Sequence, residues 1–82
     1  MTLYDFNRGS QEERLAWTWQ HGAYLSYRFH LGHRIALYHL SEFFIEVYYQ
    51  VQGNEVDYVR GFQSLELLAP YLAKIKLPDV IR

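Results

Sequence analysis

Serine, histidine and glutamate are the residues of this chain whose types could together carry out hydrolysis. Ser26, His39 and Glu46 lie in successive segments in which apolar residues alternate with others. If these segments are neighbouring antiparallel strands, Ser26 pairs with His39 and Glu46 lies diagonal to His39, the composition of a hydrolytic triad. A nucleophilic serine usually sits on a strained turn beside free N–H donors, whereas mid-strand N–H groups are used within the sheet. We therefore expect no enzymatic activity and keep a hydrolytic or small-ligand site at these residues as the alternative.

Histidines offer a second chemistry, metal binding. His30, His33 and His39 fall in one predicted hairpin, and His21 comes just before it. His33 is in the turn and the other two are several residue pairs apart, so three ligands do not converge at the roughly 2.1 Å that zinc requires. The chain has no cysteine, and its five glycines are scattered, which excludes disulfides and a phosphate-binding loop. We expect no metal and no cofactor.

The composition limits the other classes of function. The 82 residues suffice for one small domain, 1–82, and the aromatic fraction of 18% favours an aromatic-rich core. The net charge is −1, and basic residues do not gather into the patch typical of nucleic-acid binding. No apolar stretch is long enough to span a membrane, and the first residues lack the pattern of a signal peptide. We expect a cytoplasmic protein with no nucleic-acid or membrane partner.

Alternation of apolar residues between Tyr24 and Phe62 predicts an antiparallel sheet. The expected strands are residues 23–31, 34–40, 43–52 and 55–62. Two-residue turns are expected at Gly32-His33, Ser41-Glu42 and Gly53-Asn54. With these turns one parity forms a continuous apolar face from Leu25 to Phe62, interrupted by Arg60. A bulge in the last strand would turn Arg60 out and Val59 in.

Helices are expected before and after these strands. Ser10 and Glu13 form a capping box, and Gly22 is placed to end the first helix in a left-handed cap. Residues 65–75 carry a leucine stripe interrupted by Pro70, which predicts a kink or a 3₁₀ turn. Both helices fit on the apolar face. The prediction is an α+β domain in two layers, a four-stranded antiparallel meander with the N-terminal and the C-terminal helix on one face.

Tryptophans in the first helix are expected to differ in their surroundings. Trp19 shares a helix face with Leu15 and should lie in the core. Trp17 lies nearly opposite, so it either packs under the N-terminal segment 3–6 or forms part of a contact surface.

The second face of the sheet is the expected site of function. In the predicted register Ile35 lies opposite Tyr48 and Leu37 lies opposite Glu46, which gives an apolar centre surrounded by polar residues. That composition is typical of protein interfaces, although a solvated sheet face and a ligand pocket remain open. The interface candidates are Ile35, Leu37, Phe44, Tyr48, Arg28, His39 and Trp17.

Apolar patterns occur at Ile35-Ala36-Leu37-Tyr38, in the segment 43–47 and at Pro70-Tyr71-Leu72 with Ile75. In these segments the chain resembles small uncharacterised bacterial proteins of about 80 residues. The resemblance implies a stand-alone cytoplasmic domain and supplies no site residues. The leading hypothesis is a non-enzymatic protein-binding domain, a homodimer or a partner of another protein, that uses the second sheet face or the sheet edge.

Overall fold

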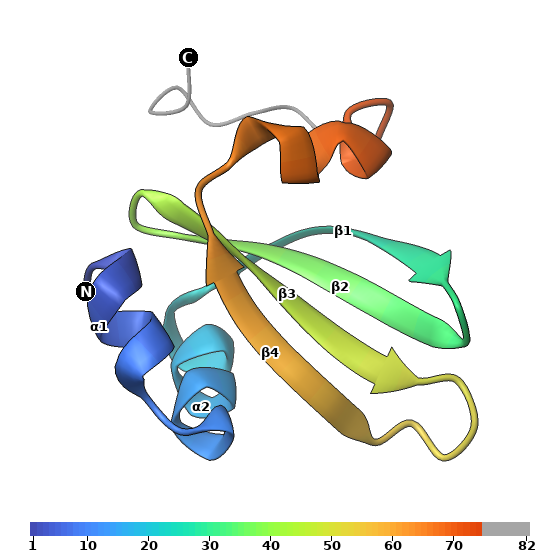
Figure 1. The fold of residues 1–82 in the computed structure, drawn as a ribbon, viewed down its shortest axis with the longest axis horizontal. Coiled ribbons are helices and arrows are strands. Elements are labelled where there is room, and N and C mark those ends of the chain that lie inside the picture. Colours follow the sequence, from blue (N-terminus) through green and yellow to red (C-terminus); the bar gives the residue numbers. More distant parts are fainter. Residues whose placement is uncertain (75–82) are drawn as a thin grey trace.

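A four-stranded antiparallel sheet with short helices before and after it forms the protein (Figure 1). The computed structural model describes residues 1–74. The helices are α1 (Leu3–Arg8), α2 (Gln11–His21) and the 3₁₀ helix η1 (Leu65–Tyr71). The strands are β1 (Ala23–His30), β2 (His33–Leu40), β3 (Phe43–Gln50) and β4 (Val56–Phe62). They pair in chain order, so the predicted α+β class and antiparallel meander are confirmed.

Capping boxes fix the start of both N-terminal helices. In α2 the Ser10 hydroxyl accepts from the Glu13 N–H at 3.1 Å, and the Glu13 carboxylate accepts from the Ser10 N–H at 2.9 Å. Thr2 and Asp5 form the same pair before α1, a short helix that the sequence pattern does not predict. Gly22 ends α2 as expected, but its φ of −78° is not left-handed. Within residues 1–74, no helix combines the length and apolar character needed to cross a membrane.

The register between β2 and β3 is the predicted one. Ile35 pairs with Tyr48 and Leu37 pairs with Glu46, across the predicted turn at Ser41-Glu42. The first turn is Leu31-Gly32 instead of Gly32-His33, because both residues take positive φ values, 48° and 81°, which a tight hairpin turn requires. This change moves the β1–β2 pairing by two residues. Because the shift is an even number, the side chains of residues 26–30 keep the faces predicted for them.

Two β-bulges change which side chains face which layer. Between Tyr48 and Tyr49 the pairing of β3 with β4 shifts, because Asp57 has no partner residue. The shift turns Val59 into the core, 1% exposed, and Arg60 to the opposite face beside Glu46, as a last-strand bulge was expected to do. It also moves Tyr58 and Phe62 away from the face predicted for them. A second bulge in β1, between Tyr24 and Ser26, turns Leu25 toward the same face as Phe62.

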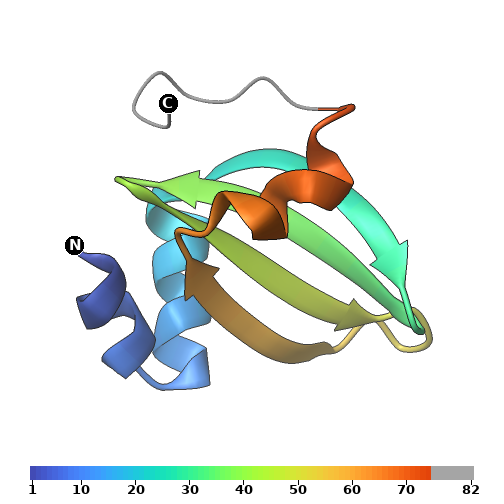
Figure 2. The ribbon, with the colours of Figure 1, turned by 45° about the horizontal axis from the view of Figure 1, so that its top comes forward.

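The two faces of the sheet carry separate cores, so the structure has three layers. We call the side of Phe43, Ile45 and Val47 the helix face, because Phe6 of α1 and residues of α2 pack there. We call the side of Phe44 and Glu46 the η1 face, because Leu68 and Tyr71 of η1 pack there. These two sets of core residues correct the prediction of both helices on one face. Figure 2 shows η1 lying across the strands with α2 behind them.

The reason for the third layer is the apolar content of the η1 face. Leu37 and Phe44 are too apolar to stay in water, and a short helix is enough to cover them. The C-terminal element is a 3₁₀ helix from Leu65 to Tyr71 that contains Pro70, in place of an α-helix over 65–75. Residue 75 and the tail predicted at 79–82 lie outside the described residues.

Candidate functional site

Three of the predicted interface residues lie in the core. Ile35, Leu37 and Phe44 are each 0% exposed. Leu37 and Phe44 pack against Leu68 and Tyr71 of η1. The apolar character that suggests a partner site therefore serves the packing of η1, and these side chains offer no surface to another protein.

The remaining predicted interface residues are half-buried. Arg28 and Tyr48 lie beside the buried Glu46, and His39 packs on the Phe44 ring with centroids 5.2 Å apart. The Trp17 ring packs on the Phe6 ring with centroids 5.9 Å apart, so the expected packing under the N-terminal segment is confirmed. On the η1 face Tyr48 also packs beside the exposed Tyr58, with ring centroids 5.7 Å apart.

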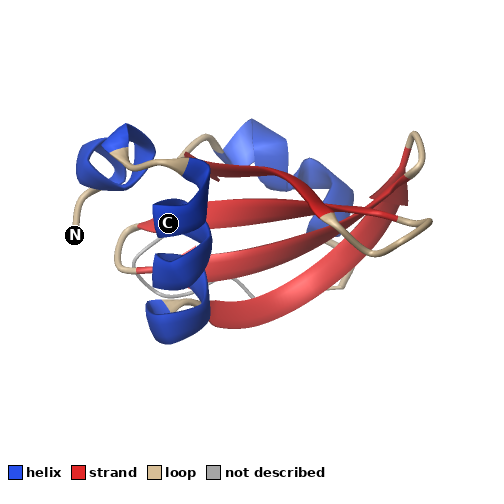
Figure 3. Ribbon diagram, turned by 90° about the horizontal axis from the view of Figure 1, so that it is seen from below, coloured by secondary structure: helices blue, strands red, loops and turns tan. Residues whose placement is uncertain are grey.

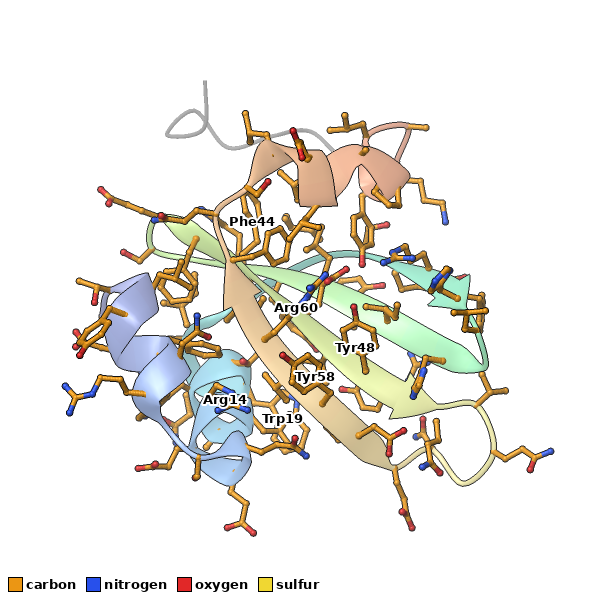
Figure 4. The ribbon with its side chains drawn as sticks, in the orientation of Figure 1. Arg14, Trp19, Phe44, Tyr48, Tyr58 and Arg60 are labelled. Carbon is orange, nitrogen blue, oxygen red and sulfur yellow. The ribbon has the colours of Figure 1, made fainter. Side chains whose placement is uncertain are left out.

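Glu46, 0% exposed, is the centre of a polar network on the η1 face. Its Oε1 accepts from Arg60 Nε at 2.9 Å and Nη2 at 2.8 Å, and from the Tyr48 hydroxyl at 3.2 Å. Its Oε2 accepts from the Tyr71 hydroxyl at 2.6 Å and lies 3.4 Å from Nη2 of Arg28. Figure 4 shows Tyr48 and Arg60 over neighbouring strands. The two guanidinium groups and two hydroxyls replace the water that a buried carboxylate loses.

The electrostatics of the network hold its donors in their protonated forms. Burial, and then the neighbouring Glu46 carboxylate, raise the pKa of Tyr71 well above that of a free phenol. Burial alone would lower the pKa of Arg60, but the hydrogen bonds to Glu46 and its charge raise that pKa overall. Because two guanidinium groups and two hydroxyls already donate to Glu46, the carboxylate is a structural acceptor that joins η1 to the sheet.

Ser26, His39 and Glu46 are not brought together as a triad. Ser26 pairs with Leu37, and His39 pairs with Ala23. The shifted first turn moves the partner of Ser26 two residues along β2, from His39 to Leu37. Among the hydrogen bonds of residues 1–74, none joins any two of the three.

The histidines of the first hairpin form one polar contact with β4. His33 Nε2 lies 2.8 Å from Oδ2 of Asp57, whose other oxygen accepts from Gln50 at 2.8 Å. The hydrogen bond from His33 is the main reason that the pKa of Asp57 is lowered. The part of the chain that the structure describes has no group of three or more His, Cys, Asp or Glu residues able to hold a metal ion.

Exposed aromatic side chains gather instead on the helix face. We call them the aromatic surface; its members are Trp19, Tyr24, Tyr27, Phe29, Tyr38 and Tyr49. Trp19, Tyr24, Tyr27 and Phe29 are 43–64% exposed, and Tyr38 and Tyr49 are half-buried. The Tyr24 and Tyr38 rings meet edge to face at 5.7 Å, as do those of Tyr27 and Phe29.

The aromatic surface is open because α2 runs across one end of the sheet and α1 is short (Figure 3). Helix α2 has 11 residues, about 16 Å of length, and crosses one end of the sheet, beyond which the strands continue (Figure 3). Trp19 projects from α2 on the side away from α1 (Figure 4), which explains its 60% exposure against the core position expected for it. The alternation pattern places Tyr27 and Phe29 on the correct face but does not show how much of that face is covered.

Side chains occupy backbone groups at both edges of the sheet. At β4, Asn7 donates to the Gly61 carbonyl at 3.3 Å and accepts from the Gly61 N–H at 3.2 Å. Arg14 Nε donates to the Val59 carbonyl at 2.9 Å. At β1, Lys74 donates to the Tyr27 carbonyl at 3.2 Å. Such contacts are a common way to prevent another strand from adding to an edge.

No protein-family model, no curated protein and no solved structure matches this chain.

Proposed function

We propose that the protein is a non-enzymatic protein-binding domain and that the aromatic surface is its contact surface. The observation that carries this proposal is the gathering of six aromatic side chains from α2, β1, β2 and β3 on the uncovered half of the helix face. Apolar patches of this kind mark contact sites more often than they mark plain solvated surface.

The composition of the aromatic surface supports a protein partner. Tyrosine, tryptophan, phenylalanine and arginine are enriched in protein interfaces, whereas lysine and acidic residues are depleted at their centre. Arg34 lies within the surface, its guanidinium 4.7 Å from the Tyr49 ring centroid, and Lys74 lies at the border beside Tyr27. Two cations fall short of the basic groove that binding to a nucleic-acid strand requires.

The alternative of a hydrolytic or small-ligand site has less support. Glu46 is used by two arginines and two tyrosines, and Ser26 and His39 lie opposite different residues. A shallow depression of about 380 Å³ lies beside the β1–β2 turn and the loop after β3, and it is lined by Gly32, Gln50, Val51 and Gln52 and by none of these three residues. A cytoplasmic location is part of the proposal, since a chain without cysteine fits a reducing compartment.

Site-specific photo-crosslinking in cells that make the protein tests this function. A photoreactive phenylalanine analogue at position 29 is compared with the same analogue at position 58, which is similarly exposed but lies on the η1 face. Protein adducts are expected from position 29 and not from position 58. Equal labelling at both positions, or no adduct from position 29, contradicts the proposal.

A further inference from the structure

We infer that the partner of the aromatic surface is a second copy of this chain, so that two copies associate through their helix faces about a twofold axis. This inference rests on the proposed function and names its partner. In a twofold contact each copy presents the same patch to the other.

The exposed aromatic area suits the centre of a dimer interface. A fully buried aromatic side chain removes on the order of 150–250 Å² from water, so the open parts of Trp19, Tyr24, Tyr27 and Phe29 amount to roughly 330–560 Å². A stable interface takes about 800 Å² from each partner, with an apolar centre and a polar rim. The four side chains thus supply the centre, and the surrounding strand and helix residues supply the rim.

The cations at this surface lie against aromatic rings, a contact that a second copy can also offer. Arg34 and Lys74 each face a tyrosine ring of their own chain, at 4.7 Å and 5.3 Å from the centroids. No described carboxylate takes part in these contacts. In a twofold contact the tyrosine and phenylalanine rings of one copy can pack on the rings and guanidinium of the other, which makes the surface complementary to itself.

The edges explain why the contact is face to face and stops at two copies. Asn7 and Arg14 occupy backbone groups of β4, and Lys74 occupies the Tyr27 carbonyl of β1. Strand addition at these positions would have to displace them. A twofold contact uses the aromatic surface of both copies, so further copies have no second site of this kind.

Sedimentation equilibrium of the full chain from about 1 to 100 μM measures the association. The expected mass at the upper concentrations is twice that of one chain. Phe29→Glu places a charge at the most exposed ring of the surface and should weaken dimerisation by at least about 30-fold. Trp19→Glu tests the same surface from the helix and should weaken it comparably. Tyr58→Glu, a matched control on the η1 face, should leave the dimer unchanged.

The outcomes separate this inference from the proposed function. A wild-type monomer at about 100 μM, or a dimer that survives both Phe29→Glu and Trp19→Glu with a native circular dichroism spectrum, overturns the homodimer. If adducts still form from position 29 with a different protein, the binding function stands without self-association. If position 29 gives no adduct, the function fails as well. Binding of single-stranded poly(U) in a titration, if it is lost in Phe29→Glu, would also overturn the homodimer, because the surface would then bind a nucleic acid.

Discussion

The Tyr71 hydroxyl donates a 2.6 Å hydrogen bond to Oε2 of Glu46, and this bond joins η1 to the centre of β3. Both residues are 0% exposed. A hydrogen bond to a buried charge is roughly twice as strong as one between neutral groups. The contact holds Leu68 over Leu37 and Phe44, so the cover of the η1 face depends on one buried carboxylate.

Replacing Glu46 by alanine should lower the free energy of unfolding by about 3–5 kcal/mol. The change leaves the buried Tyr71 hydroxyl and the partly buried guanidinium groups of Arg60 and Arg28 without their shared acceptor. Glu46→Gln keeps the shape and should cost less. Urea denaturation followed by circular dichroism measures the loss, and the exposed Glu42→Ala should stay within about 0.5 kcal/mol of wild type. A Glu46→Ala variant as stable as that control would contradict the structural role of the network.

Stability should fall at alkaline pH through Tyr71. The folded protein raises the pKa of Tyr71 above the unfolded value of 10.0, because burial and Glu46 favour the neutral phenol. The stabilisation is therefore complete below about pH 10 and is lost as pH rises further toward the folded pKa. One proton corresponds to a slope of at most about 1.4 kcal/mol per pH unit.

The variant Tyr71→Phe isolates this effect. It removes the titrating group and should cost about 1.5–3 kcal/mol at neutral pH, because Glu46 loses a charge-assisted hydrogen bond. Its free energy of unfolding should then decline less steeply above about pH 10 than that of wild type. Tyr58→Phe, an exposed control, should keep the wild-type slope. Identical slopes for wild type and Tyr71→Phe would assign the alkaline transition to other tyrosines.

Gly61 should not tolerate a side chain, because α1 packs directly on it. A Cβ at this position would lie 2.8 Å from Leu3 Cδ1 and 2.9 Å from Phe6 Cδ2. Gly61→Ala should destabilise the protein by about 1–3 kcal/mol. The cost should shrink in a Leu3→Ala background, where space is free, and a double-mutant cycle from thermal melts gives the coupling. Additive effects would show that α1 does not press on β4 at this point.

Asn7 should protect the edge of β4. Asn7→Ala frees the N–H and the carbonyl of Gly61 and should cost about 1 kcal/mol. Exposed strand groups also promote association, so light scattering on prolonged incubation should rise faster than for wild type. Gln20→Ala, an exposed change on α2, serves as the control. Unchanged scattering would mean that Arg14 alone is sufficient to block the edge.

The sheet could be predicted from sequence because alternation and turn residues are local signals. Ile35 opposite Tyr48 follows from the length of a single turn, and Ser10 with Glu13 marks a helix start without tertiary information. The bulge that buries Val59 was also foreseeable, since Arg60 fell on an apolar face. Such features depend on residues that are near one another in the chain.

The site could not be predicted because it depends on which layer covers which face. Leu37 and Phe44 have the same apolar character whether η1 or a partner covers them, and the sequence pattern does not distinguish the two. In the same way, Tyr27 and Phe29 fit a core pattern but lie beyond the reach of α2. Glu46 signals its role only through the distant partners Arg60 and Tyr71.

The place of Tyr71 in the chain gives the fold an order in time during synthesis. Residues leave the ribosome in sequence, so the hairpin that carries Glu46 emerges before Arg60 and well before Tyr71, 25 residues later. Until then the carboxylate stays hydrated, and the apolar residues of the η1 face remain exposed to chaperones. Emergence of η1 from the ribosome, after all four strands, is thus the event that closes the η1 face.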